Sequence, residues 1–229
     1  MKPSKLLSAF TSLLLALFLL TAAIAVPILC RPFYYAQIGS LKLAEQTGWS
    51  QEVIRGAFDE VMDYLVKDAS FGTGALKWSE SGRSHFADCK ALFRLDFILL
   101  GITALLLLLM IALLWRKKLR LYRFLGQGPC FWAFVGMAAV FLLLAAWALV
   151  DFTSLFTAFH TVFFPGKTNW VFDWHTDEII LILPEAFWVR AATLVAVLAF
   201  GSGAVLAVAE KIICCKTAKN VYEELRALR

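Results

Sequence analysis

Four long runs of apolar residues dominate the pattern of hydrophobic and polar positions along the chain. They occupy about residues 6–29, 92–115, 129–150 and 187–209. Each run can cross the roughly 30 Å hydrocarbon core of a bilayer as a helix, which takes about 20 residues. The pattern predicts an all-α membrane protein, in which residues 1–229 form a single integral membrane domain with four transmembrane helices.

The first polar interval, about residues 30–91, contains the pattern of an amphipathic helix that would form an outer subdomain. Ser50 is a favourable N-cap, and the apolar residues after it recur at helical spacing, so they share one face. This stripe could lie on the membrane or cover the ends of the bundle. Another helical pattern starts near Ser84 and continues without a breaker into the second membrane helix. The stripe consists of Ile54, Phe58, Val61, Met62 and Leu65.

The second polar interval, about residues 151–186, is rich in aromatic residues, which favour the boundary between lipid and water. Helix breakers interrupt it at Pro165, Gly166 and Pro184. Because exposed irregular backbone is not tolerated in lipid, we expect an interfacial loop of short pieces that pack against protein.

Charge predicts the orientation of the helices. With both termini and the 116–128 loop in the cytoplasm, the inner side carries 12 basic and 3 acidic residues, and the outer side 10 basic and 14 acidic residues. Cytoplasmic loops of membrane proteins are enriched in Lys and Arg. The basic pI of about 9.0 therefore reports orientation, and we expect no nucleic-acid partner.

The first apolar run and the cysteines leave two questions open. The run resembles a signal peptide at its basic start, but its length and the following Pro27 favour an uncleaved anchor. Cys30 and Cys89 both fall on the predicted outer side, where a disulfide is permitted. For Cys214 and Cys215, an apolar packing role is favoured over acylation.

Known catalytic motifs are scarce. The sequence has no HExxH, no GxSxG and no phosphate-binding glycine loop, and the small residues at 201–203 are explained by helix packing. We expect neither a metal nor a cofactor.

Several ionisable residues lie at the predicted outer ends of the apolar runs, where charges are costly unless they face one another. One interpretation is a set of structural ion pairs, and the other is a shared polar cavity, which we favour. All three histidines lie on the same side. Asp88 follows His85 by three residues and could orient its ring, whereas His175 is the weakest candidate. The ionisable residues are Arg94, Asp96, Asp151, Glu185 and Arg190.

Two segments carry a resemblance to a known family. They are His85-Phe-Ala-Asp88 and the stretch with His160-Thr-Val-Phe-Phe-Pro-Gly166, Trp170-Val-Phe-Asp173, Asp177 and Leu183-Pro-Glu-Ala-Phe-Trp188. Together with the four predicted helices, they resemble the bacterial lipoprotein intramolecular transacylase family, Lit. The likeness extends over essentially the whole chain.

The resemblance implies acyl transfer within a diacylglyceryl-modified lipoprotein in the bacterial cytoplasmic membrane. The sn-2 acyl chain would move to the α-amino group of the lipidated cysteine, giving an N-acyl lyso-form lipoprotein without a cofactor. We assign His85 as the base and His160 as the acid or hydrogen-bond donor. The reverse assignment and an acyl-histidine intermediate stay open. Supporting roles are expected for Asp88, Asp173, Glu185 and Arg190.

Two other functions are compatible with the residues. A non-catalytic factor could bind lipid or a partner protein through the outer aromatic surface, and a membrane hydrolase could depend on a metal. The lipoprotein and acyl-chain preferences and the oligomeric state stay open.

Overall fold

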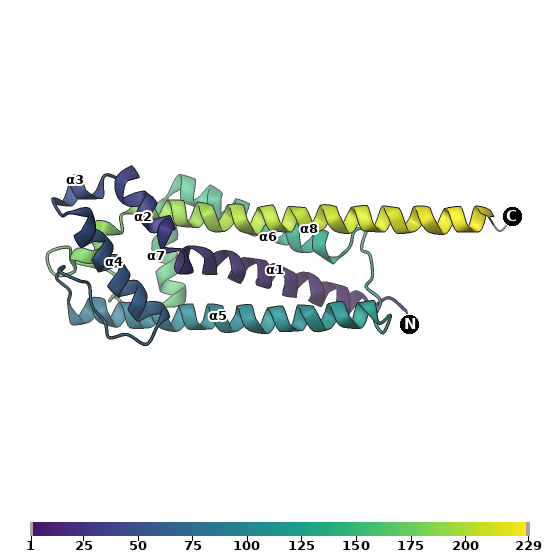
Figure 1. The fold of residues 1–229 in the computed structure, drawn as a ribbon, viewed down its shortest axis with the longest axis horizontal. Coiled ribbons are helices and arrows are strands. Elements are labelled where there is room, and N and C mark those ends of the chain that lie inside the picture. Colours follow the sequence, from purple (N-terminus) through teal and green to yellow (C-terminus); the bar gives the residue numbers. More distant parts are fainter. Residues whose placement is uncertain (1, 228–229) are drawn as a thin grey trace. The chain divides into compact units, whose positions relative to one another are not determined.

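The computed structural model describes residues 2–227, and all the named secondary-structure elements in this range are helices (Figure 1). This agrees with the predicted all-α membrane class. Four helices are long and apolar enough to cross a membrane. They are α1 (Lys5–Leu29), α5 (Glu80–Trp115), α6 (Pro129–Val150) and α8 (Glu185–Ala227). The four predicted spans are confirmed, although α5 begins 12 residues before its apolar part and α8 continues 18 residues beyond the predicted end.

The chain divides into two compact units. Unit 1 comprises residues 1–22, 99–143 and 196–229, and unit 2 comprises residues 23–98 and 144–195. Each long helix contributes residues to both units.

Unit 1 is built from the apolar helices. Leu15 and Leu19 of α1 pack with Ala133 and Met137 of α6, and partly buried residues of α5 and α8 join them. A Cβ atom at Gly203 would lie 3.0 Å from Met137 Cε. A small residue at this position therefore serves packing, as predicted for residues 201–203. Many leucines and isoleucines of these helices are exposed, as expected for side chains that face lipid.

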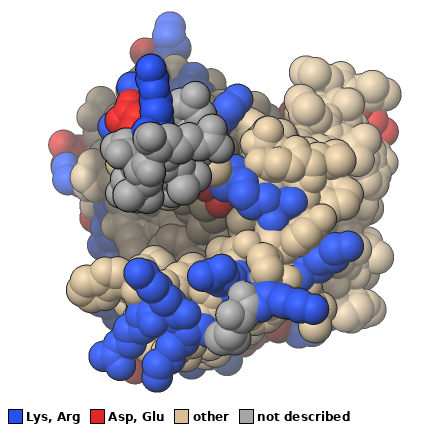
Figure 2. Space-filling model, turned by 90° about the vertical axis from the view of Figure 1, so that its right-hand side faces the viewer, with Lys and Arg blue, Asp and Glu red and all other residues tan. Residues whose placement is uncertain are grey.

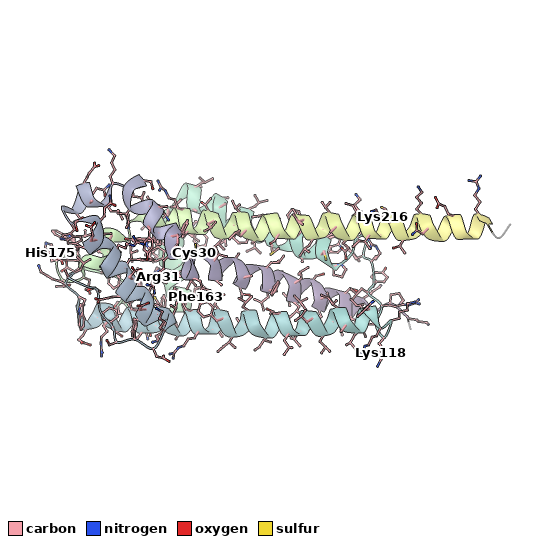
Figure 3. The ribbon with its side chains drawn as sticks, in the orientation of Figure 1. Cys30, Arg31, Lys118, Phe163, His175 and Lys216 are labelled. Atoms are coloured by element: carbon pink, nitrogen blue, oxygen red, sulfur yellow. The ribbon has the colours of Figure 1, made fainter. Side chains whose placement is uncertain are left out.

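One end of unit 1 is basic. The loop from Arg116 to Arg123 lies beside the start of the chain, where Ser4 N–H donates to Arg120 O. Figure 2 shows Lys and Arg side chains gathered on this face, and Figure 3 places Lys118 and Lys216 toward the same end. The predicted cytoplasmic Arg229 lies outside the described residues.

Unit 2 contains a larger core, formed by the short helices α2 (Arg31–Ser40), α3 (Leu43–Thr47), α4 (Gln51–Val66) and η1 (Glu178–Ile182). Ser50 caps α4 as predicted, because its side chain accepts from Val53 N–H. The whole predicted stripe of α4 is buried in protein. Tyr34 stacks on Phe58 at 3.7 Å between ring centroids and donates to Ile182 O, which fixes η1 against this core.

The aromatic interval 151–186 forms short pieces within unit 2, as expected. It contains α7 (Phe152–Phe163) and η1. Asp151 caps α7 by accepting from Ser154 N–H at 2.9 Å. The Cys30 and Cys89 thiols are both free, so the disulfide considered above is not formed.

Candidate functional site

A buried carboxylate fixes the start of α5, the helix that carries His85. Asp177 is 3% exposed, and its two oxygens accept from the backbone N–H and the hydroxyl of Ser79 at 2.8 Å each. Ser79 in turn caps the helix by accepting from Gly82 N–H. A Cβ atom at Gly82 would lie 2.1 Å from Asp177 Oδ1, so only glycine allows this approach.

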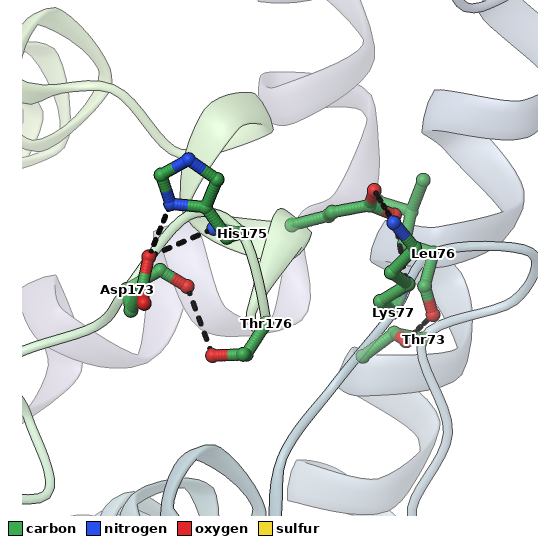
Figure 4. A network of polar contacts seen from close by, with 7 residues as sticks. Thr73, Leu76, Lys77, Asp173, His175 and Thr176 are labelled. Carbon is green, nitrogen blue, oxygen red and sulfur yellow. Dashed lines mark hydrogen bonds and ion pairs between the residues drawn. The ribbon is translucent and has the colours of Figure 1, made fainter.

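A second set of hydrogen bonds joins the segment before α5 to the start of η1. Lys77 N–H donates to the Glu178 carboxylate, Glu178 N–H donates to Lys77 O, and the Thr73 hydroxyl closes the preceding turn on Leu76 O (Figure 4). The two bonds between Lys77 and Glu178 connect residues 101 positions apart, and sequence reasoning missed them.

His85 lies in the second turn of α5 and is 7% exposed. Its ring lies edge-on to Phe164 and Phe172, with centroids 5.0 Å and 5.4 Å away. Nε2 lies 3.4 Å from Cys89 Sγ. Nδ1 is buried and has no hydrogen-bond partner among the described residues. One ring nitrogen of His85 therefore contacts a protein group, and the other has no partner among the described residues.

His160, on α7, is also 7% exposed. Its Nδ1 lies 2.8 Å from Phe156 O. A carbonyl only accepts hydrogen bonds, so the proton of the neutral ring is on Nδ1 and the lone pair is on Nε2. Phe156 and Trp170 pack on the ring, with centroids at 4.1 Å and 4.7 Å. The His85 and His160 rings are 5.9 Å apart, so the structure brings together the two histidines predicted to be catalytic.

Both imidazoles are held in the neutral form. His85 precedes the apolar part of α5, and burial, together with the neighbouring His160, lowers its pKa to about 4. Burial also lowers the pKa of His160, against the opposing effect of the bond to Phe156 O. At neutral pH each ring therefore has one N–H and one lone pair.

Asp88 does not orient His85, and this expectation was wrong. Its oxygens accept from Lys167 Nζ at 2.5 Å and from Asn169 Nδ2 at 3.0 Å. On a helix, residues three apart share a face, but a neighbouring cation attracts a carboxylate more strongly than a neutral ring does. Asp88 instead fastens residues 167–169, next to Trp170, to α5.

A carboxylate–histidine pair is formed instead by Asp173 and His175. Asp173 Oδ1 accepts from both the backbone N–H and the ring Nδ1 of His175, at 2.9 Å and 2.8 Å (Figure 4). Both side chains are exposed, at 65% and 62%. Figure 3 shows His175 far from Cys30 and Phe163. Asp173, predicted to support the catalytic pair, contacts the third histidine.

The shared cavity predicted for the outer charged residues is not formed. Arg94 donates to Asp68 at 2.8 Å, and Arg190 donates to Ser40 at 2.6 Å. Arg94, Glu185 and Arg190 are exposed, and Asp151 is used as a helix cap. Arg94 and Arg190 therefore have local partners, whereas Asp96 Oδ2 is buried without a hydrogen-bond partner among the described residues.

Glu185 has a different connection to the histidines. It lines a cavity of about 220 Å³ together with Phe156, Leu183 and Trp188, and Phe156 packs on His160. Within residues 2–227, no three His, Cys, Asp or Glu side chains are grouped so that they could hold a metal ion.

Comparisons with known proteins identify the family of this fold and site. A solved structure of the membrane-integral lipoprotein intramolecular transacylase Lit from Bacillus cereus is similar, with a TM-score of 0.74 and 24% identity over 97% of each chain. A variant of that protein with a histidine-to-alanine substitution gives 0.77 and 23% identity over 93% of this chain and 94% of that one. These identities support a shared fold. No curated protein matched the chain by sequence. The model of the family described as "Lipoprotein intramolecular transacylase Lit" matches residues 9–188, and the chain belongs to this family.

Proposed function

We propose that this chain moves the sn-2 acyl chain of a diacylglyceryl-modified lipoprotein to the α-amino group of the lipidated cysteine, and that His160 and His85 perform the proton chemistry. Family membership supplies the reaction class, intramolecular acyl transfer on a lipoprotein. The observation that carries the assignment is a buried pair of neutral histidines, 5.9 Å apart, with His160 Nε2 and His85 Nδ1 free of protein partners in the described structure.

In this mechanism His160 is the base. The amine nitrogen attacks the ester carbonyl and forms the C–N bond, while His160 Nε2 takes the proton that the nitrogen loses. His85 Nδ1–H donates to the oxyanion, which a fixed donor stabilises strongly where water is excluded. The C–O bond then breaks, and the protonated His160 returns the proton to the departing glyceryl oxygen. This reverses the roles expected from the sequence, because the Phe156 carbonyl leaves a lone pair on His160.

The aromatic walls favour an amphiphilic substrate. Phe164, Phe172 and Trp170 enclose the rings, and the adjoining apolar cavity extends from Phe156 to Trp188. Amine and ester belong to one molecule, so holding them at reacting distance supplies a large part of the acceleration. No separate acyl donor is required.

The chain is a multi-pass membrane protein. Within this proposal it lies in the bacterial cytoplasmic membrane with both termini inside and the histidines facing the outer leaflet. The basic face of unit 1 supports this orientation. A cysteine introduced at Lys77 should react with an impermeant reagent in intact cells, whereas one introduced at Lys118 should not; labelling at Lys118 contradicts the orientation.

Mass spectrometry of a diacylglyceryl lipopeptide incubated with the purified protein tests the reaction. The expected product has the same mass as the substrate but carries an N-terminal amide, seen by fragmentation. A non-catalytic lipid-binding factor would leave the substrate unchanged, and a hydrolase would release free fatty acid. Either result contradicts the proposal.

A further inference from the structure

Cys89 is a polar neighbour of His85 to which the sequence alone assigned no role in catalysis. It lies one helical turn after His85, and its Sγ is 3.4 Å from His85 Nε2. The thiol is free and partly buried.

We propose that the Cys89 thiol donates its hydrogen to His85 Nε2 and so keeps the ring proton of His85 on Nδ1, the atom that donates to the oxyanion in the proposed function. This inference rests on the proposed function. Cys89 is a positioning residue, since it acts through His85.

The surroundings of the two groups favour this direction of donation. Donation from Nε2 to sulfur would leave both the thiol hydrogen and the Nδ1 lone pair without a partner among the described residues, whereas donation from the thiol leaves only Nδ1–H unpaired. Burial raises the pKa of Cys89 to about 12, which keeps the thiol protonated. The rings that face His85 are apolar, apart from that of His160.

The charged and polar groups nearby are already engaged. Asp88 accepts from Lys167 and Asn169, and Asn169 also donates to the Ser84 hydroxyl. None of them competes with Cys89 for Nε2.

The result is a pair of histidines with opposite tautomers. The Phe156 carbonyl holds the proton of His160 on Nδ1, which exposes a lone pair on Nε2. The Cys89 thiol does the reverse for His85 and exposes an N–H. The group four residues away on the same helix, Phe156 for His160 and Cys89 for His85, thus sets the tautomer of each ring. One histidine can then act as the base and the other as the oxyanion donor.

The test combines ¹⁵N NMR of histidine-labelled protein with kinetics on the lipopeptide. The chain has only 3 histidines, so His160→Gln and His175→Gln variants assign the His85 signals. We expect protonated Nδ1 in the wild type and a mixture of tautomers in Cys89→Ala. In that variant kcat should fall about fivefold with KM unchanged, the factor typical of one lost neutral hydrogen bond. Cys89→Ser, which keeps a donor, should restore most of kcat, and Cys30→Ala should behave as wild type.

A proton on Nε2 of His85 in the wild type overturns the inference, even if Cys89→Ala does not fold. Equal kcat and tautomer in wild type and Cys89→Ala overturn it as well. Failure of the proposed function looks different, because either the wild type would give no N-acyl product or His85→Ala and His160→Ala would still convert the substrate.

Discussion

The three histidines of unit 2 occupy two contrasting environments. His175 has a carboxylate partner in Asp173, but both side chains are exposed. His85 and His160 have no carboxylate partner among the described residues, yet each is 7% exposed and enclosed by aromatic rings. A polar contact between exposed side chains competes with water and contributes little, whereas hydrogen bonds in a water-excluded site act at low dielectric. Burial and a free nitrogen atom therefore distinguish the two histidines proposed to be catalytic from His175, which has a carboxylate partner.

The largest expected effect comes from removing either buried histidine. His160→Ala and His85→Ala should each reduce kcat by about 10²–10⁴, the usual contribution of positioned proton transfer. Conversion of the lipopeptide by each purified variant measures this loss. His175→Ala is the matched control and should retain wild-type activity. If the His175 variant loses activity and the other two variants keep it, the exposed histidine is the catalytic one and the buried pair is not.

The pH dependence tests whether the buried pair stays neutral. The substrate α-amino group, with a pKa of about 7.7–8.0, must lose its proton, so kcat/KM should fall about tenfold per pH unit below that value. The pKa of His85 is lowered to about 4 and that of His160 is lowered by burial, so we expect both rings to gain a proton only below the ordinary imidazole pKa of about 6.5. The slope of log kcat/KM against pH should therefore stay at one through pH 6.5. A change to a slope of two near pH 6.5 would show that a histidine titrates normally.

The two aspartates of the 173–177 segment should differ in their effect on stability. Asp177→Ala removes the buried acceptor for both Ser79 groups, and an unmet buried hydrogen bond costs about 1–3 kcal/mol. We expect a Tm lower by several degrees in detergent and lower activity, because the start of α5 is released. Asp173→Ala removes an exposed pair that water already screens, so its Tm should stay close to that of wild type. Equal Tm values for the two variants would contradict this assignment.

The smallest effect is expected at Asp88. Asp88→Asn keeps a hydrogen-bonding group toward Lys167 and Asn169 but removes the charge, and this half-exposed ion pair contributes up to about 1 kcal/mol. We expect at most a fivefold drop in kcat/KM, without a change in the pH profile. A loss as large as that of His85→Ala would restore the role that the sequence suggested for Asp88, that of orienting the ring.

The sequence predicted the elements of this protein because they depend on local patterns. Apolar runs of bilayer length identified the four long helices, and a cap followed by a stripe identified α4. It also predicted the two histidines that the fold brings together, through their shared side of the membrane and the family motifs.

Only the tertiary structure decided the partners of the polar side chains. Asp88 accepts hydrogen bonds from Lys167 and Asn169, and Arg94 donates to Asp68. Asp177 accepts from Ser79, 98 positions away in the sequence. Helical spacing shows which residues share a face, but it does not show which cation or N–H another segment brings to that face. Cys89 is the exception, because its position one turn after His85 was already visible in the sequence. The free energy of a polar contact depends on burial and on competing partners, and both are properties of the folded chain.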